Sequence, residues 1–193
     1  MNNKENIEKL ESAIGRLELN ENIVYFLTYD TKNNARAAIK HIYDMALTLK
    51  ENGVKVKILV EEKSYSGVEA WLGDTYKDLE VVSIKEDKVE INIDDIIVVP
   101  EYYSNVMDQL SNVKCVKVML VQQKEFIYET LSIGSKWTDF GFDKVITTTQ
   151  QAKKYIHEYF PEVLVHIIPP IIGDNFKHSS KSLKPYIAIS CRD

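Results

Sequence analysis

The chain has 193 residues, 45% of them hydrophobic, which is enough for one full core and argues against disorder. Its formal net charge of -5 argues against a nucleic-acid partner, because affinity for a phosphate backbone depends on clustered lysine and arginine. Cys115 and Cys191 form neither a disulfide framework nor a metal-ligand spacing, and no apolar run reaches the ~18 residues of a membrane span. We therefore expect a cytoplasmic protein without a metal site or a transmembrane segment.

The first part of the chain predicts a helix followed by a strand, helix and strand. A helical stripe of apolar residues occurs within the first 20 residues, at Ile7, Leu10, Ile14 and Leu17. A nearly all-apolar strand is expected over residues 23–29 and a second strand over residues 54–60. Between them, an amphipathic helix begins at Ala35 and ends at a glycine cap, Gly53. We expect Asn33 or Asn34 to cap the start of this helix.

The remainder of the chain continues the alternation of strands and helices. Apolar runs predict strands at residues 79–84, 95–100, 116–121, 144–148 and 163–168, with a short extra strand at residues 88–93. Helices fit at residues 103–110 and 150–160. Short buried strands alternating with helices predict an α/β fold, a doubly wound, Rossmann-like, mostly parallel sheet with helices on both faces.

The C-terminal residues read as the start of another domain. We expect one domain over residues 21–178, followed at residues 179–193 by a linker and a new apolar strand. A strand that opens a domain cannot bury both its faces within so few residues, so we expect a truncated chain. An unpaired apolar strand is a sticky edge, which predicts self-association of the chain through this strand.

Candidate ligand-binding residues follow the ends of the predicted strands, because ligands of such sheets bind outside the carboxyl ends of the strands. These residues are Tyr29, Asp30, Asn33, Asn34, Arg36, Glu101, Tyr102, Gln122, Gln123 and Thr149. Amides, hydroxyls and aromatic rings together suit a polyhydroxylated ligand, whose hydroxyls need donors and acceptors while its apolar face rests on a ring. A sugar is the natural candidate, although any α/β domain also carries polar residues where its strands end.

Several common catalytic motifs are missing from the sequence. No G-x-G-x-x-G follows the first strand, and neither a G-x-x-x-x-G-K-[ST] loop nor a G-x-S-x-G elbow occurs. The four histidines lie on predicted helices, in a strand or in the linker, and none follows a core strand. The residues alone therefore identify no catalytic group.

Four segments, taken in order, carry a resemblance to a known family. The first is a helix that has a small residue and Arg36 at its start and that ends in an L-x-x-x-G-x-x-V pattern at residues 49–56. The second is the strand at residues 94–101, and the third is the strand, threonine and helix at residues 145–156. The fourth is Ile167-Ile-Pro-Pro-Ile-Ile-Gly-Asp-Asn-Phe176. Residues 184–190 add a further strand. With this order and spacing the chain resembles, over residues 22–193, the N-terminal, acceptor-side domain of a GT-B glycosyltransferase.

This resemblance implies one half of a two-domain, hexosyltransferase-like enzyme that moves a sugar from a nucleotide-sugar donor to a sugar or glycan acceptor. It implies no covalently bound cofactor and no obligatory metal, and a domain that is inactive alone. The sequence departs from the family at Lys32-Asn33-Asn34, where a glycine-rich turn is usual, and at Gln122-Gln123, where many members have histidine. The alternatives are a stand-alone carbohydrate- or nucleotide-binding module and, disfavoured by the missing glycines, an oxidoreductase.

Overall fold

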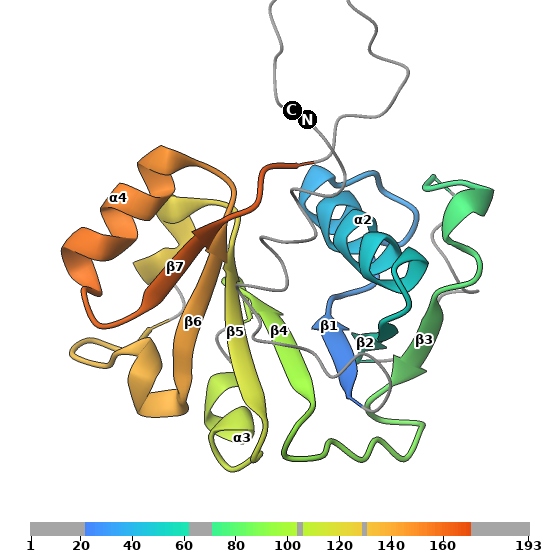
Figure 1. The fold of residues 1–193 in the computed structure, drawn as a ribbon, viewed down its shortest axis with the longest axis horizontal. Helices are drawn as coiled ribbons and strands as arrows, with labels where there is room; N and C mark the ends of the chain where they lie inside the picture. Colours follow the sequence, from blue (N-terminus) through green and yellow to red (C-terminus); the bar gives the residue numbers. More distant parts are fainter. Residues whose placement is uncertain (1–21, 62–70, 104–105, 129–130, 171–193) are drawn as a thin grey trace, which may run out of the picture.

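The computed structural model describes residues 22–61, 71–103, 106–128 and 131–170 (Figure 1). Within these ranges, seven parallel strands form one sheet in the order β3-β2-β1-β4-β5-β6-β7. The strands are β1 (Ile23–Leu27), β2 (Lys55–Val60), β3 (Glu80–Ser83), β4 (Ile96–Pro100), β5 (Val116–Val121), β6 (Phe142–Thr147) and β7 (Leu164–Ile167). The predicted N-terminal helix and C-terminal strand lie outside the described residues, so self-association through that strand stays a prediction.

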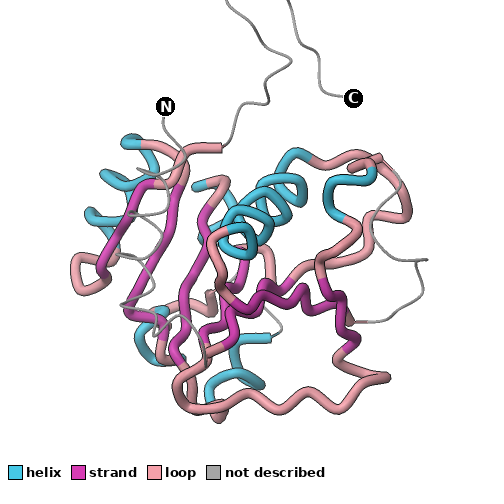
Figure 2. The backbone as a smooth tube through the Cα atoms, turned by 45° about the vertical axis from the view of Figure 1, so that its right-hand side comes forward, coloured by secondary structure: helices cyan, strands magenta, loops and turns pink. Residues whose placement is uncertain are grey.

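Helices cover both faces of the sheet, as Figures 1 and 2 show. The α-helices are α2 (Ala37–Glu51), α3 (Met107–Ser111) and α4 (Gln150–Tyr159). The 3-10 helices are η1 (Asp74–Tyr76), η3 (Lys124–Tyr128) and η4 (Trp137–Phe140). Helix α2 packs on one face, whereas α3 and α4 pack on the other. The prediction of a doubly wound, Rossmann-like α/β fold is confirmed.

Alternation along the strands divides the core into two layers. Val24 and Phe26 of β1 pack in the layer under α2, and Tyr25 and Leu27 pack in the layer under α3 and α4. All four side chains are at most 2% exposed. A strand whose two faces are both covered must be apolar at every position, which is why the continuous apolar runs identified these strands.

Between β1 and β4, the sheet reverses the direction in which successive strands are added, although all strands stay parallel. From β1 the chain steps outward to β2 and β3, then returns to place β4 on the other side of β1 and continues outward through β5, β6 and β7. The connections after β1 and β4 therefore leave the sheet in opposite directions. This topological switch point opens a crevice at the carboxyl edge, where open α/β sheets bind their ligands.

Helix α2 ends as predicted, but its start differs. At its C terminus, Gly53 has a φ of 85°, and the amides of Gly53 and Val54 donate to the carbonyls of Lys50 and Leu49. This pair of bonds is a Schellman motif. At its N terminus the capping position is Arg36, and no side chain caps the helix. The prediction that Asn33 or Asn34 caps α2 is therefore wrong.

Asn33 and Asn34 belong instead to a tight turn between β1 and α2. Lys32 and Asn33 have φ values of 51° and 63°, and the Asn34 amide donates to the Thr31 carbonyl at 3.0 Å. Positive φ at both central residues is the signature of a type I′ turn. Asp30 supports the turn, since its Oδ1 accepts the Lys32 amide at 2.7 Å. The turn thus uses the local polar groups that we expected at the helix start.

The short strand predicted at residues 88–93 is also wrong, because this segment forms no β-ladder. Val89 and Ile91 pack against the layer under α3 and α4, and the Glu90 carbonyl accepts the Tyr25 hydroxyl. Asp95 then accepts the backbone amides of Asn92 and Ile23. The alternating apolar residues of this segment therefore pack against one face of the sheet and do not pair with a strand. No pairing position is open beside β1 or β4, which are bonded on both sides.

Candidate functional site

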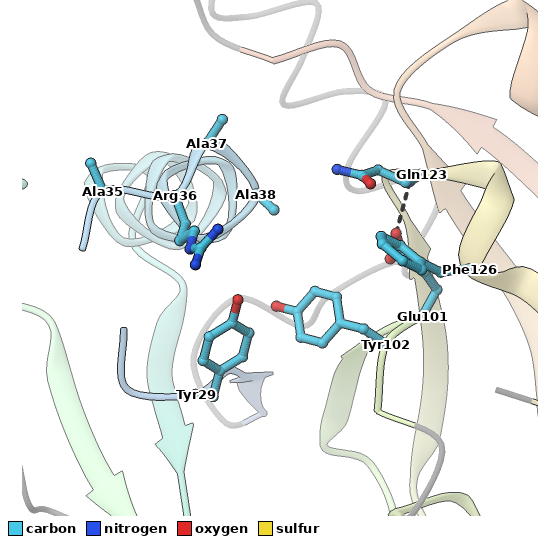
Figure 3. Close-up of a pocket in the computed structure, with 9 residues that line it drawn as sticks. All are labelled: Tyr29, Ala35, Arg36, Ala37, Ala38, Glu101, Tyr102, Gln123 and Phe126. Carbon is cyan, nitrogen blue, oxygen red and sulfur yellow. Dashed lines mark hydrogen bonds between the residues drawn. The ribbon is translucent and has the colours of Figure 1, made fainter. Parts of the chain in front are cut away.

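A pocket of about 540 Å³ lies at the switch point, over the carboxyl ends of β1, β4 and β5 (Figure 3). Its walls come from the loop after β1, the first turn of α2, the loop after β4 and the start of η3. The lining residues are Tyr29, Ala35, Arg36, Ala37, Ala38, Glu101, Tyr102, Gln123 and Phe126. Three chain segments that are distant in the sequence therefore meet around one cavity.

Glu101 is the buried acid of this pocket. It directly follows β4, and its side chain is only 1% exposed. Its Oε1 accepts the backbone amide of Gln123 at 2.7 Å, which ties the end of β4 to the end of β5. Its Oε2 is buried without a hydrogen-bond partner among the described residues. Burial raises the pKa of the Glu101 carboxyl from 4.5 to about 7, although the backbone amides of Gln123 and Gln122 act to lower it.

Two tyrosines, Tyr29 and Tyr102, line the pocket, and the ring of Tyr103 packs against both of them. The Tyr29 and Tyr102 rings meet edge to face with centroids 5.4 Å apart, and those of Tyr102 and Tyr103 lie 5.3 Å apart. Figure 3 shows the hydroxyls of Tyr29 and Tyr102 directed toward the Arg36 side of the pocket. Burial raises the pKa of both Tyr102 and Tyr103, so these hydroxyls keep their protons and remain able to donate.

The start of α2 forms the opposite wall. Its first turn begins with Ala37 and Ala38 and carries no acidic residue, so no carboxylate in that turn neutralises the positive end of the helix dipole. The Arg36 guanidinium adds a positive charge on the same wall. Gln122 joins this wall to β5, because its Nε2 donates to the Ala38 carbonyl at 2.8 Å.

Two shallower cavities continue along the same sheet edge. One, of about 400 Å³, shares Gln123 with the switch-point pocket and extends to Thr149. The other, of about 480 Å³, begins at Thr149 and reaches His166 in β7. The Thr149 hydroxyl accepts the Ala152 amide at 3.1 Å and so caps α4.

The predicted site residues fall into three groups in the structure. Five of them line the switch-point pocket together, namely Tyr29, Arg36, Glu101, Tyr102 and Gln123. Gln122 and Thr149 line the neighbouring cavity. Asp30, Asn33 and Asn34 build the type I′ turn and are not among the residues that line the pocket.

Sequence reasoning missed four lining residues, Ala35, Ala37, Ala38 and Phe126. The alanines contribute small side chains next to the backbone of the helix start, and this leaves no chemical signature in the sequence. Phe126 reaches the pocket because η3 turns the chain back after β5, and no helical pattern marked that short element.

The described residues contain neither a cluster of metal ligands nor a membrane-spanning helix. No group of three histidine, cysteine, aspartate or glutamate side chains among them is arranged to hold a metal ion. No helix in the same ranges combines the length and apolarity needed to cross a membrane.

The comparisons with known proteins identify no relative. The chain matches no family model, no curated protein and no solved structure.

Proposed function

We propose that the switch-point pocket binds a sugar or glycan, and that this domain is the acceptor-side half of a glycosyltransferase that uses a nucleotide-sugar donor. The observation that carries the proposal is the convergence of aromatic rings, an arginine, an amide and a carboxyl on one cavity at the switch point. Sugars present apolar ring faces and many hydroxyls, and each of these features has a counterpart in the pocket.

The aromatic wall suits the apolar face of a sugar ring. Tyr29 is 38% exposed although it lines a pocket, so part of its ring is available for contact. Arg36 supplies donors, Glu101 supplies an acceptor, and Figure 3 shows the Gln123 amide directed toward the α2 side of the cavity. A ligand with hydroxyls on several sides of a ring would satisfy these groups together.

The transfer reaction is proposed from the fold class and the sequence resemblance together. The resembling segments correspond to α2 and β2, to β4, and to β6 with α4. The β1–α2 connection is a type I′ turn that contains no glycine, which does not suit the close approach of a dinucleotide pyrophosphate. A stand-alone carbohydrate- or nucleotide-binding module is the second candidate, because the lining residues in Figure 3 all belong to this one domain.

Saturation-transfer NMR with D-glucose, D-galactose, D-mannose and N-acetylglucosamine tests the sugar site. We expect at least one of these sugars to bind, and Tyr29→Ala to weaken its binding about fivefold through loss of the ring contact. Tyr159→Ala is the matched control, because Tyr159 is an exposed tyrosine on α4 that does not line the pocket. Absence of binding by all four sugars would refute the sugar site.

Turnover separates the two candidate functions. Because the acceptor-side half of a transferase is expected to be inactive alone, the whole protein encoded by the gene would be incubated with the bound sugar and with UDP-, GDP- and ADP-sugars, and nucleoside diphosphate release would be measured. Release that depends on the acceptor sugar supports the transferase. Sugar binding without release from any of these donors supports the binding module.

A further inference from the structure

The free oxygen of Glu101 sets a chemical requirement on whatever fills the pocket. The side chain is 1% exposed, Oε1 is held by the Gln123 amide, and Oε2 is buried without a donor in the described part of the chain. Burying an acceptor without a partner costs free energy, and a charged group costs more than a neutral one. Natural structures rarely keep such a group unless a ligand or water satisfies it.

The tether between β4 and β5 does not explain why the residue is an acid. That tether uses one acceptor, Oε1, and a glutamine at the same position would supply the same carbonyl oxygen without a charge. What glutamate adds is a second oxygen that only accepts when it is ionised. The second oxygen therefore points to a role in binding.

The surroundings of Glu101 contain no partner that already neutralises it. Among the described residues no lysine, arginine or histidine forms an ion pair with this carboxyl. The charged or titratable groups that share the pocket are Arg36 from α2, Tyr29 from the loop after β1 and the adjacent Tyr102. Arg36 is the only basic side chain among the described residues that line the cavity with Glu101.

We infer that Glu101 Oε2 accepts a hydrogen bond from a hydroxyl of a neutral sugar bound in the switch-point pocket. The inference rests on the proposed sugar site and narrows its ligand class to neutral hydroxyl donors. An anionic sugar phosphate would present acceptors instead, and these would favour the protonated acid.

Proton linkage gives the inference a definite sign. With a pKa of about 7 in the empty pocket, close to one proton is bound at pH 6 and almost none at pH 8.5. A hydroxyl donor favours the ionised form, so affinity should rise about tenfold from pH 6 to pH 8.5 and level off above pH 7. A ligand that accepts a hydrogen bond from protonated Glu101 would bind more weakly as pH rises, and Glu101 would take up a proton when that ligand binds.

Calorimetry in two buffers of different ionisation enthalpy measures this proton directly. The four neutral sugars would be titrated at pH 6 and pH 8.5, with α-D-glucose 1-phosphate as the anionic counterpart. We expect a bound neutral sugar to release nearly one proton at pH 6 and none at pH 8.5. Sugar binding with no proton release, or tighter phosphate-ester binding with proton uptake, would overturn the inference and leave the sugar site standing. No sugar binding at all would remove both.

Two variants assign the proton to Glu101. Glu101→Gln keeps an oxygen for the Gln123 amide and replaces Oε2 by a donor, so we expect at least tenfold weaker sugar binding at pH 8.5 and no proton release. Glu125→Gln neutralises an exposed acid in the neighbouring cavity and should retain both the affinity and the released proton. Proton release that persists in Glu101→Gln would contradict the assignment. The wild-type calorimetry decides the sign even if the variant folds poorly.

Discussion

Replacing Glu101 with glutamine should stabilise the ligand-free protein at alkaline pH. The folded protein holds the Glu101 proton up to a pKa of about 7, whereas the unfolded chain releases it near 4.5. Between these values the folded state binds more protons, so the contribution of Glu101 to stability falls as pH rises. Above pH 7 the full penalty is about 3 kcal/mol, since each pKa unit corresponds to about 1.4 kcal/mol.

The substitution is closely matched in shape and in contacts. The amide oxygen of glutamine can still accept a hydrogen bond from the Gln123 amide, and well below pH 4.5 both side chains are neutral in the folded and unfolded states. The difference in unfolding free energy between variant and wild type should therefore be small at pH 4.5 and grow to about 3 kcal/mol in favour of the variant at pH 8.5.

Urea unfolding followed by the fluorescence of the buried Trp137 measures this difference at several pH values. Other titrating groups cancel in the comparison, because both proteins contain them. Glu125→Gln is the control, because it removes one carboxyl that is exposed and lies outside the switch-point pocket. A difference in unfolding free energy between Glu101→Gln and the wild type that stays constant from pH 4.5 to pH 8.5 would refute the prediction that Glu101 is buried and keeps its proton up to about pH 7.

Three further predictions concern the scaffold. Burial lowers the pKa of His41 from 6.5 to about 4, so the contribution of His41 to stability should fall by up to about 3 kcal/mol as pH falls through this window. The unfolding free energy of His41→Leu relative to the wild type should therefore rise by this amount between pH 7 and pH 4 in chemical unfolding, and a difference that does not change with pH would contradict a buried, neutral His41. Thr149→Ala removes the α4 cap and should cost about 1 kcal/mol, whereas Thr149→Ser should restore it; equal unfolding midpoints for all three proteins would contradict the cap. Gly53→Ala should cost about 1–2 kcal/mol in thermal unfolding, because φ is 85° there while a Cβ would meet no atom within 4 Å; an unchanged midpoint would contradict this strain.

The sequence predicted the sheet well because burial on both faces leaves a strong pattern. Continuous apolar runs identified β1, β4 and β5 within one or two residues of their observed bounds. The Gly53 signal located the end of α2 for a backbone reason, since the Schellman motif needs a left-handed residue. These are short-range or strongly patterned features, which one sequence can carry.

The two wrong predictions have different causes, one in a competing local interaction and one in the pairing of the whole sheet. Asn33 and Asn34 have side chains that suit a helix cap, but the same residues also favour a type I′ turn, and the turn formed. The alternation at residues 88–93 matches a strand, yet β1 and β4 each pair on both sides already. Pairing partners are set by the whole sheet, so no local pattern reveals them.

The candidate site was predictable in part. Strand ends indicated Tyr29, Glu101 and Gln123, because parallel strands bring their carboxyl ends to one edge of the sheet. The burial of Glu101 and its single free oxygen depend on the packing of loops that no motif described. The alanines at the start of α2 were missed, since their contribution is the closeness of the helix backbone.

The side-chain bond from Gln122 to the Ala38 carbonyl spans 84 positions of the sequence and fastens β5 to the first turn of α2. Together with the tether between Glu101 and Gln123, it holds opposite walls of the cavity at a fixed separation before any ligand arrives. A rigid cavity spares the ligand the entropy of ordering its own binding site. If the proposed sugar site is correct, the fixed walls would also limit the size of ring that fits, and selectivity among sugars would then arise from the scaffold as much as from the groups that touch them.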